Sequence, residues 1–130
     1  MERMLIIDDE YELLNSLQLA FGYDEYKISQ AKNEQQAIDM AEAVQPEIII
    51  MNMPGQTNDG IKAFRKLKEI PQLRNSNIIV LSAQSQHDAI LKEINDNTTY
   101  FIPKPFRQED LTTALSGIRT KRLQSNQVRN

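Results

Sequence analysis

The sequence contains no cysteine and a single histidine, His87, among its 130 residues. Disulfide bonds, thiolate nucleophiles and zinc–thiolate sites are therefore excluded, and one imidazole cannot build a histidine metal site by itself. No apolar run approaches the roughly 18 residues that a membrane span requires, and the N-terminus leads straight into an apolar run instead of a secretory signal. We therefore expect a cytoplasmic protein with no membrane partner.

Basic residues are also in deficit, since 15 lysines and arginines face 18 aspartates and glutamates, which gives a net charge of −3. This balance argues against a domain that binds nucleic acid through its bulk charge. The hydrophobic share of 40% and the charged share of 25% are typical of a globular protein that can bury a core. We therefore expect one globular domain without a nucleic-acid partner.

Five short strand-like runs alternate with segments in which apolar residues recur at helical spacing. Near-continuous apolar runs are typical of strands that are buried on both faces of a parallel sheet. The expected strands cover 4–7, 25–31, 46–52, 78–81 and 100–102, and the expected helices cover 13–21, 33–44, 61–73, 86–97 and 111–118. The run over 25–31 is more mixed, which indicates an edge strand. This alternation predicts an α/β fold, a flavodoxin-like (βα)5 three-layer sandwich with strand order 2-1-3-4-5.

The last dozen residues are polar and basic and carry no apolar pattern. We therefore expect the domain to cover residues 3–118. Residues 119–130 are expected to form a frayed polar tail or the stub of a linker.

Polar residues stand where the predicted strands end, and in an open parallel sheet these ends meet at one edge. They are Asp8 and Asp9 after the first strand, Asn52 at the end of the third, Ser82 after the fourth and Lys104 after the fifth. Two adjacent carboxylates suit Mg²⁺, and a lysine with a hydroxyl suits the oxygens of a phosphoryl group. Together such groups neutralise a phosphoryl group in transfer.

Simpler roles exist for each residue taken alone. The acids Asp8 and Asp9 could cap the first helix, because acids favour a helix N-terminus. Lys104 could be a solvated lysine beside a proline turn, and Ser82 could satisfy a backbone group at a strand end. The joint placement of all of them at strand ends favours a shared site.

The order and spacing of these residues resemble the receiver domain of bacterial two-component response regulators. The separations are 43 residues from Asp9 to Asn52, 30 from Asn52 to Ser82 and 22 from Ser82 to Lys104, all within the usual range of that family. The resemblance covers roughly residues 3–118. Its motifs are Ile6-Ile7-Asp8-Asp9-Glu10, the strand Pro46 to Asn52, Asp59-Gly60, Ser82-Ala83 and Lys104-Pro105-Phe106.

The resemblance implies a role for each matching residue at the metal site. Asp9 would bind Mg²⁺ directly, Asp8 would assist partly through water, and the backbone carbonyl of Pro54 would be the third protein ligand. This proline comes two residues earlier than the family's usual loop proline.

The resemblance also implies a set of residues that respond to the phosphoryl group. Ser82 would be the switch hydroxyl, Phe101 the aromatic switch residue, and Lys104 the partner of the phosphoryl oxygens. Pro105 stands where the family carries a cis peptide bond, which is essentially confined to bonds that precede proline.

Asn52 is the departure that decides the expected function, because the family's phosphate acceptor is an aspartate at this position. A carboxamide is uncharged and a poor nucleophile, so we expect no acyl phosphate on Asn52. The amide also replaces an anionic ligand, so Mg²⁺ binding is expected to be weakened. The chain is either a naturally atypical receiver or a conventional phosphoaspartate receiver whose acceptor has been substituted.

We therefore expect a non-enzymatic signalling module of two-component signal transduction that acts through protein–protein contacts. The partners implied are a sensor histidine kinase or another signalling protein. A homodimer is also implied through the face of helix 4, strand 5 and helix 5, about residues 86–118. An alternative of another class is a flavodoxin-like enzyme or nucleotide-binding domain. The loops after the first and third strands lack the glycine-rich phosphate cradle that such a function would favour.

Overall fold

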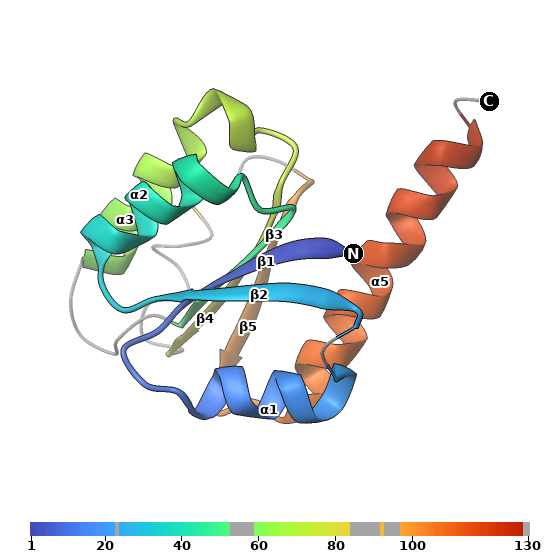
Figure 1. Ribbon diagram of the computed structural model, residues 1–130, viewed down its shortest axis with the longest axis horizontal. Coiled ribbons are helices and arrows are strands. Elements are labelled where there is room, and N and C mark those ends of the chain that lie inside the picture. Colours follow the sequence, from blue (N-terminus) through green and yellow to red (C-terminus); the bar gives the residue numbers. More distant parts are fainter. Residues whose placement is uncertain (23, 53–58, 84–91, 93–96, 129–130) are drawn as a thin grey trace.

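A computed structural model describes residues 1–22, 24–52, 59–83, 92 and 97–128 (Figure 1). Five parallel strands form one sheet in the order β2-β1-β3-β4-β5, as the alternating pattern predicted. The strands are β1 (Glu2–Ile7), β2 (Tyr26–Ala31), β3 (Ile48–Asn52), β4 (Asn77–Ala83) and β5 (Thr99–Lys104). The predicted edge strand is β2, which lies at one end of the sheet.

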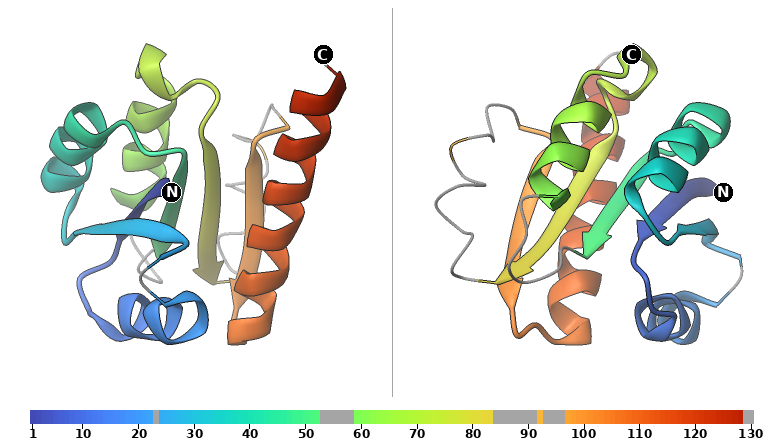
Figure 2. Two further views of the ribbon diagram at one scale, coloured as in Figure 1. Left: turned by 45° about the vertical axis from the view of Figure 1, so that its right-hand side comes forward. Right: turned by 90° about the vertical axis from the view of Figure 1, so that its left-hand side faces the viewer.

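Helices lie on both faces of the sheet, so the predicted three-layer flavodoxin-like arrangement is confirmed (Figure 2). They are α1 (Glu12–Phe21), α2 (Glu34–Val44), α3 (Asp59–Lys68), the 3-10 helix η1 (Pro71–Leu73) and α5 (Gln108–Val128). The helix expected over 61–73 is interrupted before Pro71, which separates α3 from η1. The helix expected over 86–97 lies outside the described residues, apart from Lys92 and Asn97.

Local sequence signals set the ends of two helices. Gly22 ends α1 with a φ of 72°, a conformation that glycine adopts at little cost. Asn33 caps α2, since its side chain accepts a hydrogen bond from the backbone N–H of Gln36 at 2.9 Å. Glycine after a helix and asparagine before one are typical end signals, and they agree with the helix ranges 13–21 and 33–44 expected from the sequence.

The central strand β3 divides the core into two layers. Ile48 and Ile50 pack toward α1 and α5, and Ile49 and Met51 pack toward α2 and α3. All four side chains are buried, which accounts for the unbroken apolar run. Since side chains alternate between faces along a strand, Asn52 follows Ile50 on the α1 and α5 side.

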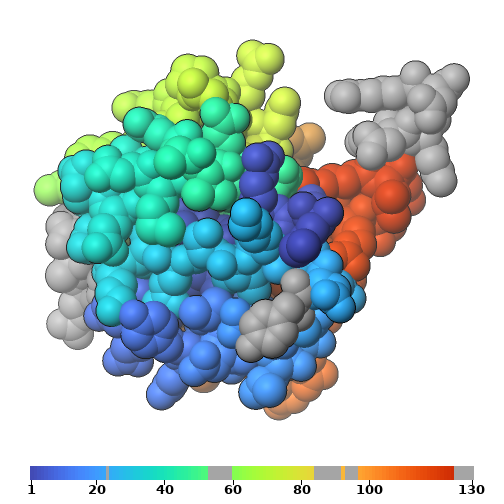
Figure 3. All heavy atoms as spheres, viewed as in Figure 1, coloured from blue at the N-terminus to red at the C-terminus, as the bar shows by residue number. Residues whose placement is uncertain are grey.

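The C-terminal residues do not form the frayed tail that their polar composition predicted. Helix α5 continues to Val128, and its late turn lies beside the N-terminal residues in the space-filling view (Figure 3). A long-range contact holds this turn, because the Arg122 guanidinium forms an ion pair with Glu2. It also donates to the carbonyl oxygen of Glu47 at 2.6 Å and to Asn77 Oδ1 at 2.7 Å.

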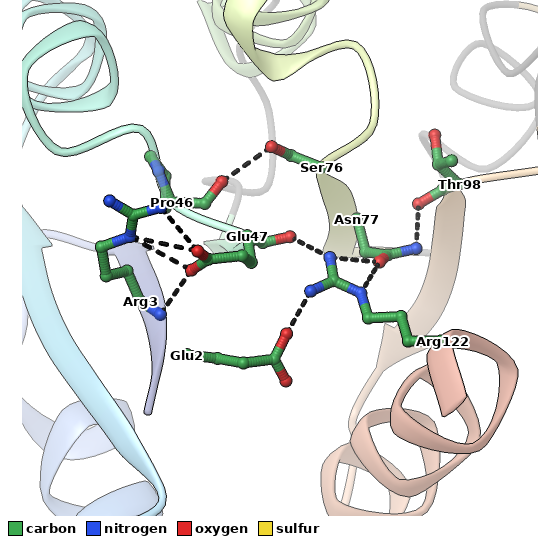
Figure 4. Close-up of polar contacts among 8 residues, drawn as sticks. All are labelled: Glu2, Arg3, Pro46, Glu47, Ser76, Asn77, Thr98 and Arg122. Carbon is green, nitrogen blue, oxygen red and sulfur yellow. Dashed lines mark hydrogen bonds and ion pairs between the residues drawn. The ribbon is translucent and has the colours of Figure 1, made fainter. Parts of the chain in front are cut away.

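These contacts form one polar network at the amino ends of the strands (Figure 4). Asn77 extends the network toward β5, because its Nδ2 donates a hydrogen bond to the carbonyl oxygen of Thr98. Arg122 therefore ties α5 to the starts of β1, β3 and β4. This edge of the sheet is opposite to the one where the predicted site residues stand.

Glu47 in the same network also pairs with Arg3, and we expect this pair to make stability depend on pH. Burial of the Glu47 carboxyl opposes its ionisation, but hydrogen bonds from Arg3 outweigh burial and hold the pKa of Glu47 below its ordinary value. A carboxyl with a lowered pKa in the folded state stabilises at neutral pH, and this contribution is lost as the pH falls through that pKa.

The test is urea unfolding of the protein and of Glu47→Gln at several pH values. Because both side chains are partly exposed, the difference in free energy of unfolding at pH 7 is expected to stay below about 1 kcal/mol. It should shrink between about pH 5 and pH 3, where the carboxylate takes up a proton. A difference that grows on acidification would contradict this assignment.

Candidate functional site

A cleft of about 530 Å³ opens at the carboxyl ends of the strands. Four of the predicted site residues line it, namely Asp8, Asp9, Asn52 and Lys104. They come from the ends of β1, β3 and β5, so the convergence expected from the topology is present. The cleft is within the size range of small-ligand sites in proteins.

Asp8 and Asn52 lie next to each other because β1 and β3 are neighbours in parallel register, with Ile7 opposite Met51. Asn52 Nδ2 donates a hydrogen bond to Asp8 Oδ2 at 2.9 Å. The other carboxylate oxygen of Asp8 accepts from the backbone N–H of Glu10 at 3.0 Å. Asp8 is therefore satisfied by the chain itself, although only 7% of its surface is exposed.

Within the described residues, the Asn52 amide is hydrogen-bonded through its nitrogen and not through its oxygen. Its Nδ2 bonds Asp8, whereas its Oδ1 is buried and has no partner within the described part of the chain. A buried acceptor of this kind ordinarily has a partner, so Oδ1 of Asn52 is the atom of this pair that remains able to accept a hydrogen bond.

The remaining predicted residues are arranged differently. Ser82 is fully buried, its hydroxyl donates to the carbonyl oxygen of Ala83 at 3.3 Å, and it is not among the described residues that line the cleft. Phe101 is half-buried and packs against the core beneath α2 and α3. The Lys104–Pro105 peptide bond is cis, as the resemblance implies. Pro54 lies outside the described residues.

Two further residues shape the cleft and were not singled out from the sequence. Gln30, at the end of the edge strand, donates from Nε2 to the carbonyl oxygens of Asp8 and Glu10, each at 2.8 Å, and so holds the turn after β1. Lys32 lines the cleft with its Nζ 4.6 Å from the centre of the Tyr11 ring. Neither residue belongs to a local motif, so no sequence pattern marks it.

Two absences in the described residues bear on metals and membranes. Within those residues, no three histidine, aspartate or glutamate side chains are grouped so that they could hold a metal ion. Among the helices that the structure describes, none is both long and apolar enough to cross a bilayer.

Comparisons with known sequences and with solved structures point to the same family. The response regulator receiver domain family matches residues 4–116. Sporulation initiation phosphotransferase F of Bacillus subtilis is 27% identical over 114 residues, covering 88% of this chain and 90% of that protein.

A second relative is longer than this chain. The transcriptional regulatory protein PdtaR of Mycobacterium tuberculosis is 32% identical over 114 residues, covering 87% of this chain and 54% of that protein. This chain therefore spans about half the length of PdtaR.

A solved structure shows the same fold. It is the receiver domain of the sensor histidine kinase PA1611 from Pseudomonas aeruginosa PAO1, with a magnesium ion coordinated in its active site cleft. It superposes with a TM-score of 0.70 at 22% identity and covers 88% of this chain and 93% of that chain.

Proposed function

The chain belongs to the response regulator receiver domain family, and on that premise we propose that it signals through protein–protein contacts without phosphorylation of Asn52. Receiver domains of two-component systems are generally non-enzymatic signalling domains that interact with histidine kinases or phosphotransferases. The family match favours this function over the alternative of a flavodoxin-like enzyme or nucleotide-binding domain.

The observation that carries the proposal is the amide of Asn52 at the end of β3, hydrogen-bonded to Asp8 inside the cleft. An amide is uncharged and a poor nucleophile, and here its nitrogen is already engaged with a neighbouring carboxylate. A phosphoryl group would therefore find no reactive oxygen at this position. Receiver domains bind Mg²⁺ at the active site, and we infer that the loss of one carboxylate weakens that binding here.

We propose that partners dock on the face that includes β5 and the first turns of α5, with a second copy of the chain as one of them. Residues 86–118 were assigned to this face from the family resemblance. A protein partner suits the proposal, because the conformation of the domain would then be set by contacts with that partner and not by a covalently bound phosphate. The proposed partners are a sensor histidine kinase or another signalling protein.

Exposure to a small phosphodonor such as acetyl phosphate with MgCl₂ tests the central claim. We expect the intact mass of the protein to stay unchanged, because Asn52 cannot form an acyl phosphate. Intact-mass spectrometry at neutral pH is the measurement. A phosphate-sized gain in mass that disappears in Asn52→Ala would refute the proposal.

The second candidate function is a conventional phosphoaspartate receiver whose acceptor has been replaced by Asn52. The grouping of Asp8, Asp9 and Lys104 in one cleft favours it, because these residues would still serve an aspartate. Asn52→Asp discriminates between the two candidates. Ready uptake of phosphate by this variant would favour the substituted receiver, whereas no uptake would favour a naturally atypical one.

A further inference from the structure

The Asp8 carboxylate is a buried charge, so its oxygens need partners inside the protein. It is almost fully buried, and burial of an ionised carboxylate is costly unless its oxygens are paired. Here both oxygens are paired by the chain itself, Oδ1 by the backbone N–H of Glu10 and Oδ2 by Nδ2 of Asn52. The carboxylate is therefore satisfied without an ion.

An aspartate at position 52 would change this balance. Its oxygen would face Asp8 Oδ2 at the place where Nδ2 now lies, 2.9 Å away. Two carboxylates at such a distance repel each other unless a cation or a proton lies between them. With aspartate the pair would depend on a cation, whereas with asparagine it does not.

The described residues do not fit a magnesium ion between Asp8 and Asn52. Mg²⁺ demands oxygen ligands in near-octahedral geometry, but Asn52 presents its NH₂ group to Asp8. Rotation of the amide would present Oδ1 instead, at the cost of the bond to Asp8. Without an ion, that rotation would also place two acceptors against each other.

We propose that the Asn52–Asp8 hydrogen bond takes the structural place of the divalent cation, so that the acidic end of the cleft keeps its shape without metal. The domain then needs no Mg²⁺ to hold Asp8 and Asn52 in place. The inference rests on the proposed function, in which position 52 carries no phosphate. It goes further in stating that the asparagine itself replaces the ion.

Thermal unfolding with and without Mg²⁺ tests this proposal on the full chain. We expect the Tm of the protein to differ by less than about 1 °C between EDTA and about 10 mM MgCl₂ at equal ionic strength. We expect Asn52→Asp to unfold about 5 °C lower in EDTA and to regain most of that loss with about 10 mM MgCl₂. By isothermal titration, the variant should bind Mg²⁺ at least about tenfold more tightly than the protein does.

Asn75→Asp is the matched control, because Asn75 is exposed and lines the groove at the amino ends of the strands. It adds the same charge far from the cleft, so its Tm should not respond to Mg²⁺. If Asn52→Asp folds only when MgCl₂ is present, the proposal is supported. If it does not fold at all, Asn52→Ala replaces it, because this variant frees Asp8 Oδ2 and should acquire a rise of Tm with Mg²⁺.

A Tm of the unaltered protein that rises with Mg²⁺ as much as that of Asn52→Asp would overturn the proposal. Equal stability of the protein and Asn52→Asp in EDTA would also overturn it. The phosphodonor test and the Mg²⁺ test can fail independently of each other. A gain of phosphate with a flat response to Mg²⁺ contradicts only the proposed function, and stabilisation by Mg²⁺ without a gain of phosphate contradicts only this inference.

Discussion

Replacement of Arg122 by methionine is expected to lower the free energy of unfolding by about 3 kcal/mol. The Arg122 side chain is about three-quarters buried, and its guanidinium donates to the Glu47 carbonyl oxygen and to Asn77 Oδ1, besides its ion pair with Glu2. Methionine keeps most of the aliphatic volume but supplies no donor. The decrease in the free energy of unfolding therefore arises from acceptors that are left unpaired at the amino ends of the strands. Urea unfolding measures this decrease.

Arg107→Met is the matched control for this substitution. Arg107 makes a loose ion pair with Glu109 at 3.7 Å, and 82% of its side chain is exposed. A surface pair of this kind contributes less than about 1 kcal/mol. If the two variants lose equal stability, the network around Arg122 does not hold α5 to the sheet.

Leu115→Ala is the second substitution with a large expected effect, a loss of about 3 kcal/mol in the free energy of unfolding. Leu115 is fully buried in the layer between α5 and the sheet, where it packs in the same cluster as Ile50. Truncation to alanine removes apolar contacts and leaves a cavity that the rigid strands fill poorly. Urea unfolding followed by circular dichroism is the measurement.

Leu123→Ala is the matched control, because it makes the same chemical change about two helical turns later in α5. Leu123 is 58% exposed, so its truncation should cost less than about 0.5 kcal/mol. Similar losses at Leu115 and Leu123 would mean that α5 does not bury the face that the structure assigns to it.

The strands and their order could be predicted because parallel strands buried on both faces leave an unmistakable pattern. The run of Ile48 to Met51 is apolar on both faces, and right-handed crossovers leave few orders for five such strands. The helix ends at Gly22 and Asn33 were predictable too, because a glycine after a helix and an asparagine before one are local signals. A feature that is set by residues close to it in the sequence can be predicted from the sequence.

The grouping of Asp8, Asp9, Asn52 and Lys104 was also predictable, because topology alone brings the carboxyl ends of the strands together. The orientation of the Asn52 amide was not. It follows from the Asp8 carboxylate, which lies 44 residues away in the sequence and accepts a hydrogen bond from Nδ2 of Asn52. The support that Gln30 gives to the turn after β1 was missed for the same reason.

The frayed tail was a wrong prediction with a specific cause. The stretch beyond Ile118 lacks apolar periodicity, so composition indicated disorder. Long-range polar contacts hold this stretch: Arg122 bonds Glu47 and Asn77, which are 75 and 45 residues away in the sequence, and Arg119 pairs with Glu25 at 3.4 Å. Contacts between residues so far apart leave no local pattern, so the pattern along the chain could not indicate that the helix continues.

The anchor of α5 has a practical consequence for anyone who joins this domain to a reporter or exchanges it between regulators. A fusion point at residue 118 would keep the apolar layer but discard the guanidinium that gathers the beginnings of three strands. We therefore expect a fragment that ends at residue 118 to be less stable than one that extends through Arg122, so a junction placed after the guanidinium is the better choice.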